Sequence, residues 1–189
     1  MKTEHRLWSL EEGWSDVTAS GSLQDAQLVL LFGHPSKLKE ENLFKEIRQY
    51  YPKSYILGGS TAGEILKTRV YDDSLVSTAI QFENTIIKSA HIKIADRKDS
   101  LSIGEELVGA LDHKQLRHVF VLADGLNVNG SELVKGMAKH LPKGIGVTGG
   151  LTGDGTNFVE TLVGANQMSE SKNVVALGFY GIHLKVHYG

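Results

Sequence analysis

The predicted fold is organised around the stretch Gly144-Ile-Gly-Val-Thr-Gly-Gly-Leu-Thr-Gly-Asp-Gly155, because a related stretch occurs earlier in the chain. The earlier copy is Ser54-Tyr-Ile-Leu-Gly-Gly-Ser-Thr-Ala-Gly-Glu64. Both copies follow a Pro-Lys pair and contain a double glycine, then a threonine, then a glycine followed by an acid. Glycine has no Cβ, so its backbone can approach a ligand closely. The two copies therefore predict a pseudo-symmetric site built on two glycine-rich turns.

The similarity extends outward from these turns at a constant offset of 90 residues. Glu132–Lys143 aligns without a gap with Asn42–Lys53, and His118–Leu122 aligns with Leu28–Phe32. Each copy contains a buried strand, a helix, a second strand, the glycine turn and further strands. The strands expected after the turns are 75–82 and 85–94 in the first copy, and 158–163, 174–180 and 182–188 in the second. The pattern predicts an internal duplication over residues 27–94 and 117–188.

The fold class follows from the order of these elements. Strand–helix–strand units imply parallel neighbours, and hairpins add antiparallel strands. We predict an α/β fold of mixed parallel and antiparallel sheets with outer helices, made of a duplicated β-α-β-turn-β-β unit with approximate twofold symmetry. A helix near 102–112, opened by a capping box at Ser102 and Glu105, is expected to join the repeats. Residues 1–25 are expected to be an N-terminal extension with a short helix around Leu7–Trp14.

Composition excludes several functional classes. The 189 residues carry a net charge of −2, which gives no electrostatic footprint for nucleic acid or anionic membrane. The chain has no cysteine, so disulfides, thiolate nucleophiles and cysteine-ligated metals are impossible. No apolar run approaches the roughly 20 residues of a membrane helix, and the N-terminus lacks the apolar segment of a signal peptide. These features predict a cytoplasmic protein without nucleic-acid binding or membrane insertion.

The glycine turns are the predicted binding site. Ligands in such sheets bind at strand ends, where consecutive N–H groups can receive a carboxylate. Ser60, Thr61 and Thr152 offer hydroxyls, and Glu64 and Asp154 offer partners for an ammonium. This combination favours a zwitterion such as an amino acid over a phosphate. The alternative interpretation is that the glycines only allow close packing of the repeats, while the acids cap local turns.

A third loop adds two candidates. Asp124 and Asn127 directly follow the buried strand that ends near Leu122, although the same residues are typical of an ordinary Asp-Gly turn. The predicted ligand-binding set therefore combines both glycine turns with this loop. It comprises Gly58, Gly59, Ser60, Thr61, Gly63, Glu64, Asp124, Asn127, Gly149, Gly150, Thr152, Gly153 and Asp154. Gly59 and Gly150 are expected to have backbone angles or contacts that exclude a Cβ.

The motifs Leu57–Glu64, Ala123–Gly125 and Val147–Asp154, with Phe158 and Thr161 beyond them, resemble those of FIST sensory domains, specifically the N-terminal FIST domain. The resemblance covers residues 26–189. It implies an intracellular input module that binds a small ligand such as an amino acid. It also implies a signalling partner such as a histidine kinase or a cyclic-nucleotide enzyme. Members of this family usually continue into a C-terminal FIST region, which this chain is expected to lack.

Two other functions remain open at this point. The resemblance also includes haem proteins that sense nitric oxide, and haem needs only one proximal histidine. The sequence does not choose among His34, His91, His118, His140, His183 and His187. His183 and His187 lie about 13 Å apart on a strand, at roughly 3.3 Å per residue, so they cannot bind one metal ion together.

An enzymatic function has weaker support in the sequence. A hydrolase or lyase would need Glu64 and Asp154 brought together as an acid–base pair. No nucleophile elbow or zinc-protease motif accompanies them. Gly144–Gly149 matches a dinucleotide-binding glycine pattern, but it lies within an expected strand and does not open a helix. The leading prediction is a non-enzymatic sensor domain without a metal or cofactor.

Overall fold

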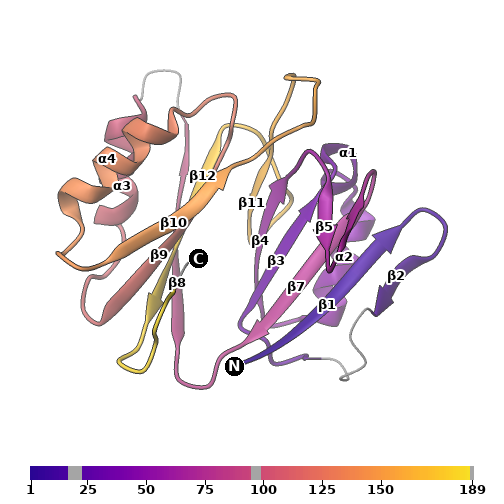
Figure 1. The fold of residues 1–189 in the computed structure, drawn as a ribbon, viewed down its shortest axis with the longest axis horizontal. Coiled ribbons are helices and arrows are strands. Elements are labelled where there is room, and N and C mark those ends of the chain that lie inside the picture. Colours follow the sequence, from indigo (N-terminus) through magenta and orange to yellow (C-terminus); the bar gives the residue numbers. More distant parts are fainter. Residues whose placement is uncertain (17–22, 95–98, 188–189) are drawn as a thin grey trace. The chain divides into compact units, whose positions relative to one another are not determined.

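The structure is a computed structural model that describes residues 1–16, 23–94 and 99–187 (Figure 1). The chain forms two compact units, each built on one large sheet. Unit 1 comprises Met1–Phe82 and Thr152–Ser171, and unit 2 comprises Glu83–Leu151 and Lys172–Gly189. The chain therefore leaves unit 1 at residue 82, returns to it at 152 and leaves it again at 171. The predicted class, α/β with mixed sheets and outer helices, is confirmed.

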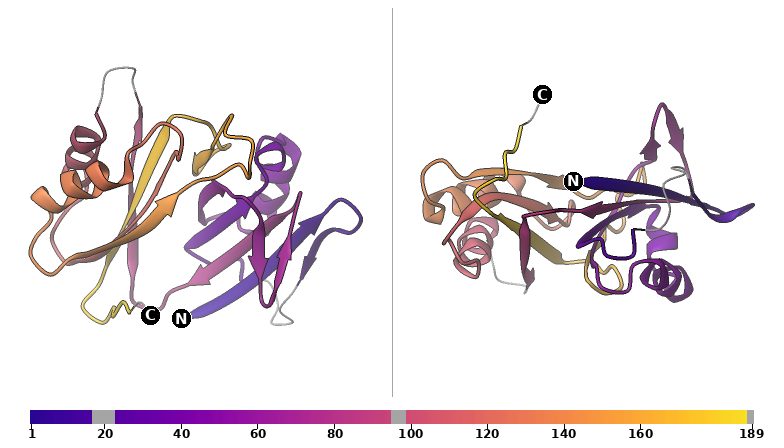
Figure 2. Two further views of the ribbon diagram at one scale, coloured as in Figure 1. Left: turned by 45° about the horizontal axis from the view of Figure 1, so that its top comes forward. Right: turned by 90° about the horizontal axis from the view of Figure 1, so that it is seen from below.

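Unit 1 has a six-stranded sheet in the order β11-β4-β3-β7-β1-β2. Its strands are β1 (Lys2–Ser9), β2 (Gly13–Asp16), β3 (Leu28–Gly33), β4 (Tyr55–Ser60), β7 (Leu75–Gln81) and β11 (Val163–Ala165). Only β3 and β4 run parallel, and α1 (Pro35–Leu38) and α2 (Glu41–Tyr50) connect them. The hairpin of β5 (Glu64–Leu66) and β6 (Arg69–Tyr71) forms a separate small sheet (Figure 2).

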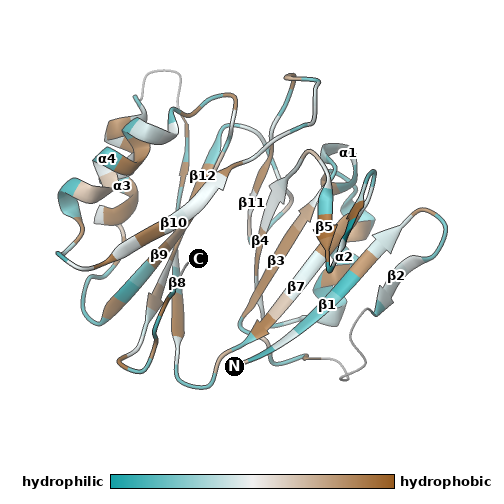
Figure 3. Cartoon of the chain, viewed as in Figure 1, coloured by the Kyte–Doolittle hydropathy of each residue, from teal (hydrophilic) through white to brown (hydrophobic). Residues whose placement is uncertain are grey.

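The core of unit 1 forms because α2 and the sheet each have an apolar side. Helical spacing places Leu43 and Ile47 on one face of α2, and both are buried. They belong to one hydrophobic cluster with Val29, Leu31 and Ile56 from the sheet. Figure 3 shows β3 as a largely hydrophobic strand, as expected for the middle of a sheet, whereas β1 is largely hydrophilic.

Unit 2 has a four-stranded sheet in the order β10-β9-β12-β8. Its elements are β8 (Ile86–Lys93), α3 (Ser100–Gly109), β9 (Leu116–Ala123), α4 (Gly130–His140), β10 (Gly146–Leu151) and β12 (Asn173–Tyr180). The two helices touch through glycines. A Cβ on Gly136 would lie 2.0 Å from the Leu101 carbonyl oxygen, and a Cβ on Gly104 would lie 2.2 Å from that of Leu133. Glycine at both positions lets the helices approach closely enough to share one core with the sheet.

The two large sheets share a four-strand pattern. The order β4-β3-β7-β1 in unit 1 corresponds to β10-β9-β12-β8 in unit 2. In each case the first pair is parallel and the next two pairs are antiparallel. In both units the fourth strand comes first along the chain, so the matching segments begin one strand earlier than the predicted repeats. Superposition of the two segments stays a prediction.

Residues 75–82 and 85–94, which are close enough in sequence to suggest a hairpin, do not pair with each other. β7 pairs with β3 and β1, whereas β8 pairs with β12. Residues 83–85 are the link by which the chain passes from unit 1 to unit 2. Each strand finds a long antiparallel partner elsewhere in its own unit, and these partners are distant in sequence. Sequence adjacency was therefore a poor guide to pairing here.

The N-terminal segment and the C-terminal strands also differ from expectation. Leu7–Trp14 is not a helix, because β1 and β2 form an antiparallel hairpin. The Ser9 hydroxyl accepts the Glu12 N–H in the turn of this hairpin. Residues 158–162 and 181–187 are not strands, and only Val163–Ala165 pairs with β4. Residue 188, which closes the last expected strand, lies outside the described residues. The helix expected near 102–112 exists as α3, but it begins at Ser100 with Asp99 as its N-cap and belongs to unit 2.

A buried polar network explains why the hydrophilic β1 lies inside the sheet. Glu4, Arg6 and Tyr51 are all at most 4% exposed. The Tyr51 hydroxyl donates to Glu4 at 2.7 Å and accepts from Arg6 Nε at 3.0 Å, and Arg6 Nη2 lies 2.7 Å from Glu4. Burial raises the pKa of Tyr51, and the bond to Glu4 raises it further. The network ties β1 to the end of α2 and satisfies charges that would otherwise be costly to bury.

Candidate functional site

The double glycines lie inside strands, not in the turns that follow them. Gly58 and Gly59 belong to β4, which pairs with β3 on one side and β11 on the other. Gly149 and Gly150 belong to β10, which pairs with β9. Because pairing engages the amides of β4 on both sides, the Gly58–Gly59 backbone is not an open nest for a carboxylate. The prediction that the glycines themselves form turns is wrong, and the irregular segments begin at Thr61 and Thr152.

The steric exclusion of a Cβ that was expected at Gly150 is found at the neighbouring Gly149 instead. Gly149 has φ of +147°, and a Cβ there would lie 1.8 Å from the Val121 carbonyl oxygen. A Cβ on Gly150 would meet nothing within 4 Å, and its φ is not positive, so the prediction for Gly150 is wrong. Gly59 also lacks a positive φ. A Cβ added to Gly58 of β4 would lie 2.6 Å from the Ser169 hydroxyl.

Both segments that follow the double glycines belong to unit 1. Residues 61–64 and 152–154 lie there, whereas Gly149, Gly150, Asp124 and Asn127 lie in unit 2. The Gly153 N–H donates to the Ser60 carbonyl at 2.9 Å, which joins the two segments. The Ser60 hydroxyl accepts the Leu162 N–H at 2.8 Å and is 1% exposed, so its observed role is structural. The structure thus divides the predicted set between the two units.

Glu64 is a buried carboxylate next to these segments. It is 2% exposed and accepts hydrogen bonds from Thr61 Oγ1 at 2.7 Å and from Ser74 Oγ at 2.6 Å. Thr61 follows the end of β4, and Ser74 directly precedes β7, so two neighbouring parts of unit 1 hold the carboxylate in place. Neutral hydroxyl donors orient a carboxylate without cancelling its charge. Glu64 therefore remains able to attract a cationic group.

Asp154 organises the loop that follows it. Its Oδ1 accepts the Phe158 N–H at 3.1 Å, and its Oδ2 accepts those of Val159 at 2.7 Å and Glu160 at 3.0 Å. The backbone hydrogen bonds, with that of Glu160 first, lower the pKa of Asp154. The side chain is 6% exposed. This geometry supports the alternative interpretation of Asp154 as a cap for its own loop.

The segments enclose a hollow of about 220 Å³ in unit 1, which we call the acidic hollow. Its lining comes from the ends of β3 and β4, the segment before β7, and the loop after Asp154. The residues are His34, Thr61, Ala62, Gly63, Glu64, Asp72, Asp73, Asp154, Gly155, Thr156 and Asn157. Four of them are carboxylates, and neither lysine nor arginine is among the described residues that line it. The arrangement concentrates negative charge where strands end.

A second hollow of about 580 Å³ adjoins the first, and we call it the Lys39 hollow. It shares His34, Asp154 and Asn157 with the acidic hollow. Lys39 and Glu160 also line it and form an ion pair with each other. Because three residues border both hollows, the two hollows lie next to each other, and we call them together the groove. Glu64, Asp72 and Asp73 line the acidic hollow, whereas Lys39 lines the other hollow together with Asp154 and Glu160.

His34 stands where the two hollows meet. It is the N-cap of α1, its Nδ1 lies 2.8 Å from Ser36 Oγ, and its Nε2 lies 3.6 Å from Asp73 Oδ1. It is the histidine, among the residues that the structure describes, that lines these hollows. His118 lies in unit 2, where Nε2 lies 2.8 Å from Thr148 Oγ1 and burial lowers its pKa. The described ranges contain no group of three or more His, Asp and Glu residues that could hold a metal ion.

Asp124 and Asn127 form a closed turn in unit 2. Asp124 is 0% exposed and accepts the N–H groups of Leu126 at 2.9 Å, Asn127 at 3.2 Å and Lys172 at 2.6 Å. The Asn127 side-chain amide donates to the same carboxylate at 2.9 Å. This is the ordinary Asp-Gly turn that the sequence left open as the alternative. The geometry gives both residues a structural role.

Sequence reasoning missed several residues of the groove. Asp72, Asp73, Thr156, Asn157 and Lys39 line it without belonging to a recognisable motif. The adjacent acids Asp72 and Asp73 were the one available signal, because they directly follow the end of β6. The sequence predicted that Asp154 would share a site with Glu64, but nothing in it indicated that Thr156 and Asn157 would line that site.

Hollows at strand ends with a few convergent polar groups are typical of α/β domains that bind small molecules. A sequence model of the FIST N domain matches residues 27–189. The chain therefore belongs to the FIST N domain family, as the resemblance of its motifs predicted. FIST domains are sensory domains, which is consistent with a sensor role. A search of curated proteins found no match. Within the described residues, no helix is both long enough and apolar enough to cross a membrane.

Proposed function

We propose that this chain is a non-enzymatic sensor domain that binds a small amino acid or a similar amine-bearing metabolite in the groove of unit 1 and passes the signal to a partner. The observation that carries the proposal is that the acidic hollow and the Lys39 hollow lie next to each other and share three lining residues, His34, Asp154 and Asn157. A zwitterion has charges of both signs a few ångströms apart. The two adjoining hollows of the groove offer groups of both signs.

The acidic hollow suits the ammonium end of such a ligand. Glu64 is buried and oriented by two hydroxyls, and Asp72 and Asp73 contribute more exposed carboxylates. Charge-assisted hydrogen bonds to carboxylates are about twice as strong as neutral ones. Coulomb attraction also grows where water is partly excluded. The buried Glu64 would bind the ammonium from inside the acidic hollow, and the exposed Asp72 would bind it at the outer edge of the hollow, which we call the rim.

The Lys39 hollow suits the carboxylate end. Lys39 is about half exposed and paired with Glu160, so a ligand carboxylate would compete with Glu160 for the same ammonium. His34 and Asn157 supply further polar groups at the junction. Asp154 acts in this proposal as a positioning residue, because its three N–H bonds hold the loop that carries Asn157 and Glu160.

A thermal-shift screen of the standard amino acids tests the proposal, with each hit repeated as its decarboxylated amine and as its N-acetyl form. Loss of the melting-temperature rise on N-acetylation is expected, because the ammonium partner is removed. The variant is Asp72→Asn, an exposed rim acid, and its matched control is Glu46→Gln on the exposed side of α2. Asp72→Asn should leave the free melting temperature unchanged and reduce the ligand-induced rise, since only native-state binding raises apparent stability. Equal rises in both variants would contradict the site.

Haem binding fits this groove poorly. His34 is the histidine positioned beside it, but most lining residues are polar or charged. A porphyrin presents two broad apolar faces, and burying them against carboxylates would leave the carboxylates desolvated. A visible absorption spectrum of the protein reconstituted with haem tests this interpretation. A Soret band that disappears in His34→Ala would replace the metabolite proposal with the haem alternative.

Acid–base catalysis by Glu64 and Asp154 has less support than binding. Both carboxylates line the acidic hollow, as the sequence required of such a pair. Asp154, however, is engaged by three backbone N–H groups, and these hold its pKa below the usual range. A general acid at neutral pH needs a raised pKa. The arrangement favours a binding role over a hydrolase or lyase.

A further inference from the structure

The four outer edges of the two large sheets are protected to different degrees. In unit 1 the edges are β2, with four residues, and β11, with three. In unit 2 the edges are β8 and β10. β8 carries Lys88 and Lys93, and charged side chains of this kind discourage pairing with another strand. Short edges and lysine-bearing edges are both common protective devices.

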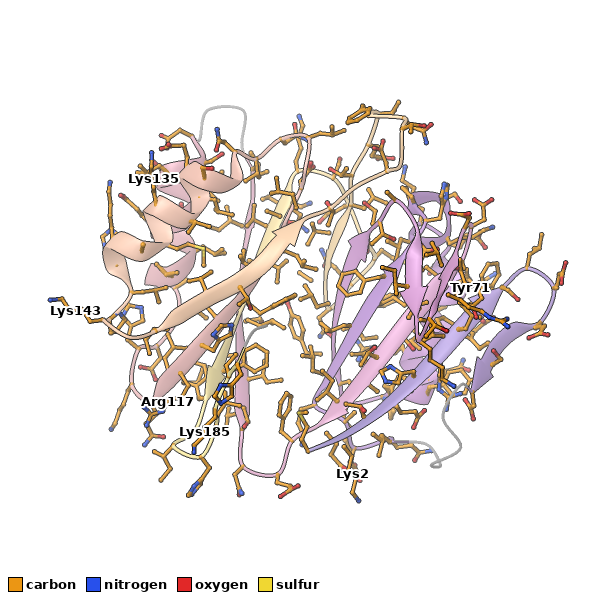
Figure 4. All side chains as sticks on the ribbon, in the orientation of Figure 1. Lys2, Tyr71, Arg117, Lys135, Lys143 and Lys185 are labelled. Carbon is orange, nitrogen blue, oxygen red and sulfur yellow. The ribbon has the colours of Figure 1, made fainter. Side chains whose placement is uncertain are left out.

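β10 has none of these devices. Its six residues, Gly-Val-Thr-Gly-Gly-Leu, include no charge and no proline. It pairs with β9 on one side, and no strand among the described residues pairs with its other side. Lys143 lies before the strand begins (Figure 4). An uncharged, unpaired edge of this length presents free N–H and C=O groups to any strand that fits it.

The same position in unit 1 is already filled. β4 corresponds to β10 in the shared strand order, and its outer side pairs antiparallel with β11. In that pairing Gly164 lies opposite Gly58, and Val163 lies opposite Gly59. The first double glycine is thus covered by an antiparallel strand of small residues. The second double glycine, Gly149 and Gly150, has the same edge without such a cover.

An apolar hollow of about 280 Å³ lies beside this edge. It is bordered by α4 and β10, and its lining includes Val134, Val147 and Leu151. Val134 is 47% exposed and Leu151 is 49% exposed, which is high for aliphatic side chains next to a sheet. A strand added at β10 would cover these side chains and would also pair the free backbone groups.

We propose that β10 pairs antiparallel with β10 of a second copy of this chain, so that the unit 2 sheets of two copies become continuous. The strand is complementary to itself when the pairing is centred on Gly149. Val147 then lies opposite Leu151 of the second copy, and Thr148 lies opposite its Gly150. Directly opposite residues share a face of the sheet, so the aliphatic residues meet each other above the two hollows. A twofold axis allows the same patch to serve both copies.

The first test measures mass by sedimentation velocity over a range of concentrations. The wild-type chain should form a dimer, and Leu151→Lys should raise the dissociation constant by at least about tenfold, because a charged side chain would then lie against the aliphatic Val147 of the second copy and disfavour pairing at this edge. Ile182→Lys is the control, since it adds the same charge at an exposed residue of unit 2 outside any strand. A wild-type chain that stays monomeric up to its solubility limit would overturn the proposal. So would a dimer that Leu151→Lys leaves intact.

The second test fixes the register and does not depend on a charged substitution. The chain has no cysteine, so one engineered thiol is unique in each variant. Val147→Cys and Leu151→Cys, mixed in equal amounts and oxidised, should cross-link with each other, because opposite Cβ atoms lie about 4.5–5.5 Å apart. Each variant alone should cross-link far more slowly, since its thiols would be about 13 Å apart at roughly 3.3 Å per residue. Equal cross-linking in all three samples would rule out pairing centred on Gly149.

Discussion

The two double glycines have the same sequence pattern and the same place in their sheets, yet their surroundings differ. Gly58 and Gly59 lie in a strand that is paired on both sides and leads into a polar groove. Gly149 and Gly150 lie in a strand that is paired on one side and borders an apolar hollow. The difference arises because residues 152–171 return to unit 1 and cover β4. A repeated motif can therefore specify a strand position while the rest of the chain decides what that strand does.

The largest expected change in stability comes from substituting Gly149 of β10, whereas substituting its neighbour Gly150 should have little effect. Gly149→Ala should destabilise the protein by about 3 kcal/mol or more, because the new Cβ would meet the Val121 carbonyl and the backbone angle is unfavourable for alanine. Gly150→Ala should change stability by less than about 1 kcal/mol, since its Cβ has open space. Urea unfolding followed by circular dichroism measures both. Similar losses in the two variants would show that the contact at Gly149 relaxes easily.

A loss of stability of intermediate size is expected when a buried aspartate of either unit is replaced. Asp154 and Asp124 each accept several N–H groups, so replacing either by asparagine exchanges one acceptor oxygen for a donor. We expect a loss of about 1–3 kcal/mol in each case. Asp124→Asn should have the larger effect, because Asp124 is fully buried. Chemical unfolding of both variants, with the exposed Asp72→Asn as control, measures the difference. An Asp154→Asn protein as stable as wild type would return Asp154 to the list of direct ligand contacts.

The smallest effect is the pH dependence of the Asp154 contribution. The pKa of Asp154 is lowered in the folded protein, so its contribution is complete above the unfolded value of about 3.9 and is lost as pH falls through the folded value. The stability difference between wild type and Asp154→Asn should therefore be constant near neutral pH and shrink below pH of about 4. Urea titrations at several pH values measure it. A difference that grows on acidification would have the opposite sign and would contradict this assignment.

Local patterns predicted the elements well and their partners less well. The buried strands that correspond to β3 and β9 and the helices that correspond to α2 and α4 were confirmed, because burial on a fixed period leaves a direct trace in sequence. β1 was missed because its inward residues include Glu4 and Arg6, whose burial depends on Tyr51, distant in sequence. The pairing of β8 with β12 was also missed, because the two strands are distant in sequence. Strand pairing is decided by long-range contacts that no local window contains.

The candidate site shows the same contrast between local motifs, which the sequence revealed, and long-range placement, which it did not. Thr61, Gly63, Glu64 and Asp154 were singled out from the motif, and the structure brings them to one hollow. Of the other predicted residues, Thr152 and Gly153 lie in unit 1 but do not line the hollow. The rest lie in strands β4 and β10 or in the closed turn of unit 2, namely Gly58, Gly59, Ser60, Gly149, Gly150, Asp124 and Asn127. The lining residues Asp72 and Asn157 lie in irregular segments, which have no periodicity to reveal which way a side chain points. Their place in the groove depends on the fold as a whole.

The return of residues 152–171 to unit 1 has a consequence for the order of synthesis. The outer side of β4 is covered by a strand that ends at Ala165, so the unit 1 sheet cannot be completed until that residue has left the ribosome. By then all of unit 2 except its last strand, β12, has been made. Neither sheet can therefore be completed early in synthesis. The sheet of unit 1 needs β11, which follows most of unit 2 in the chain, and the sheet of unit 2 needs β12, which follows β11. No single cut in the chain can release either unit with its sheet intact.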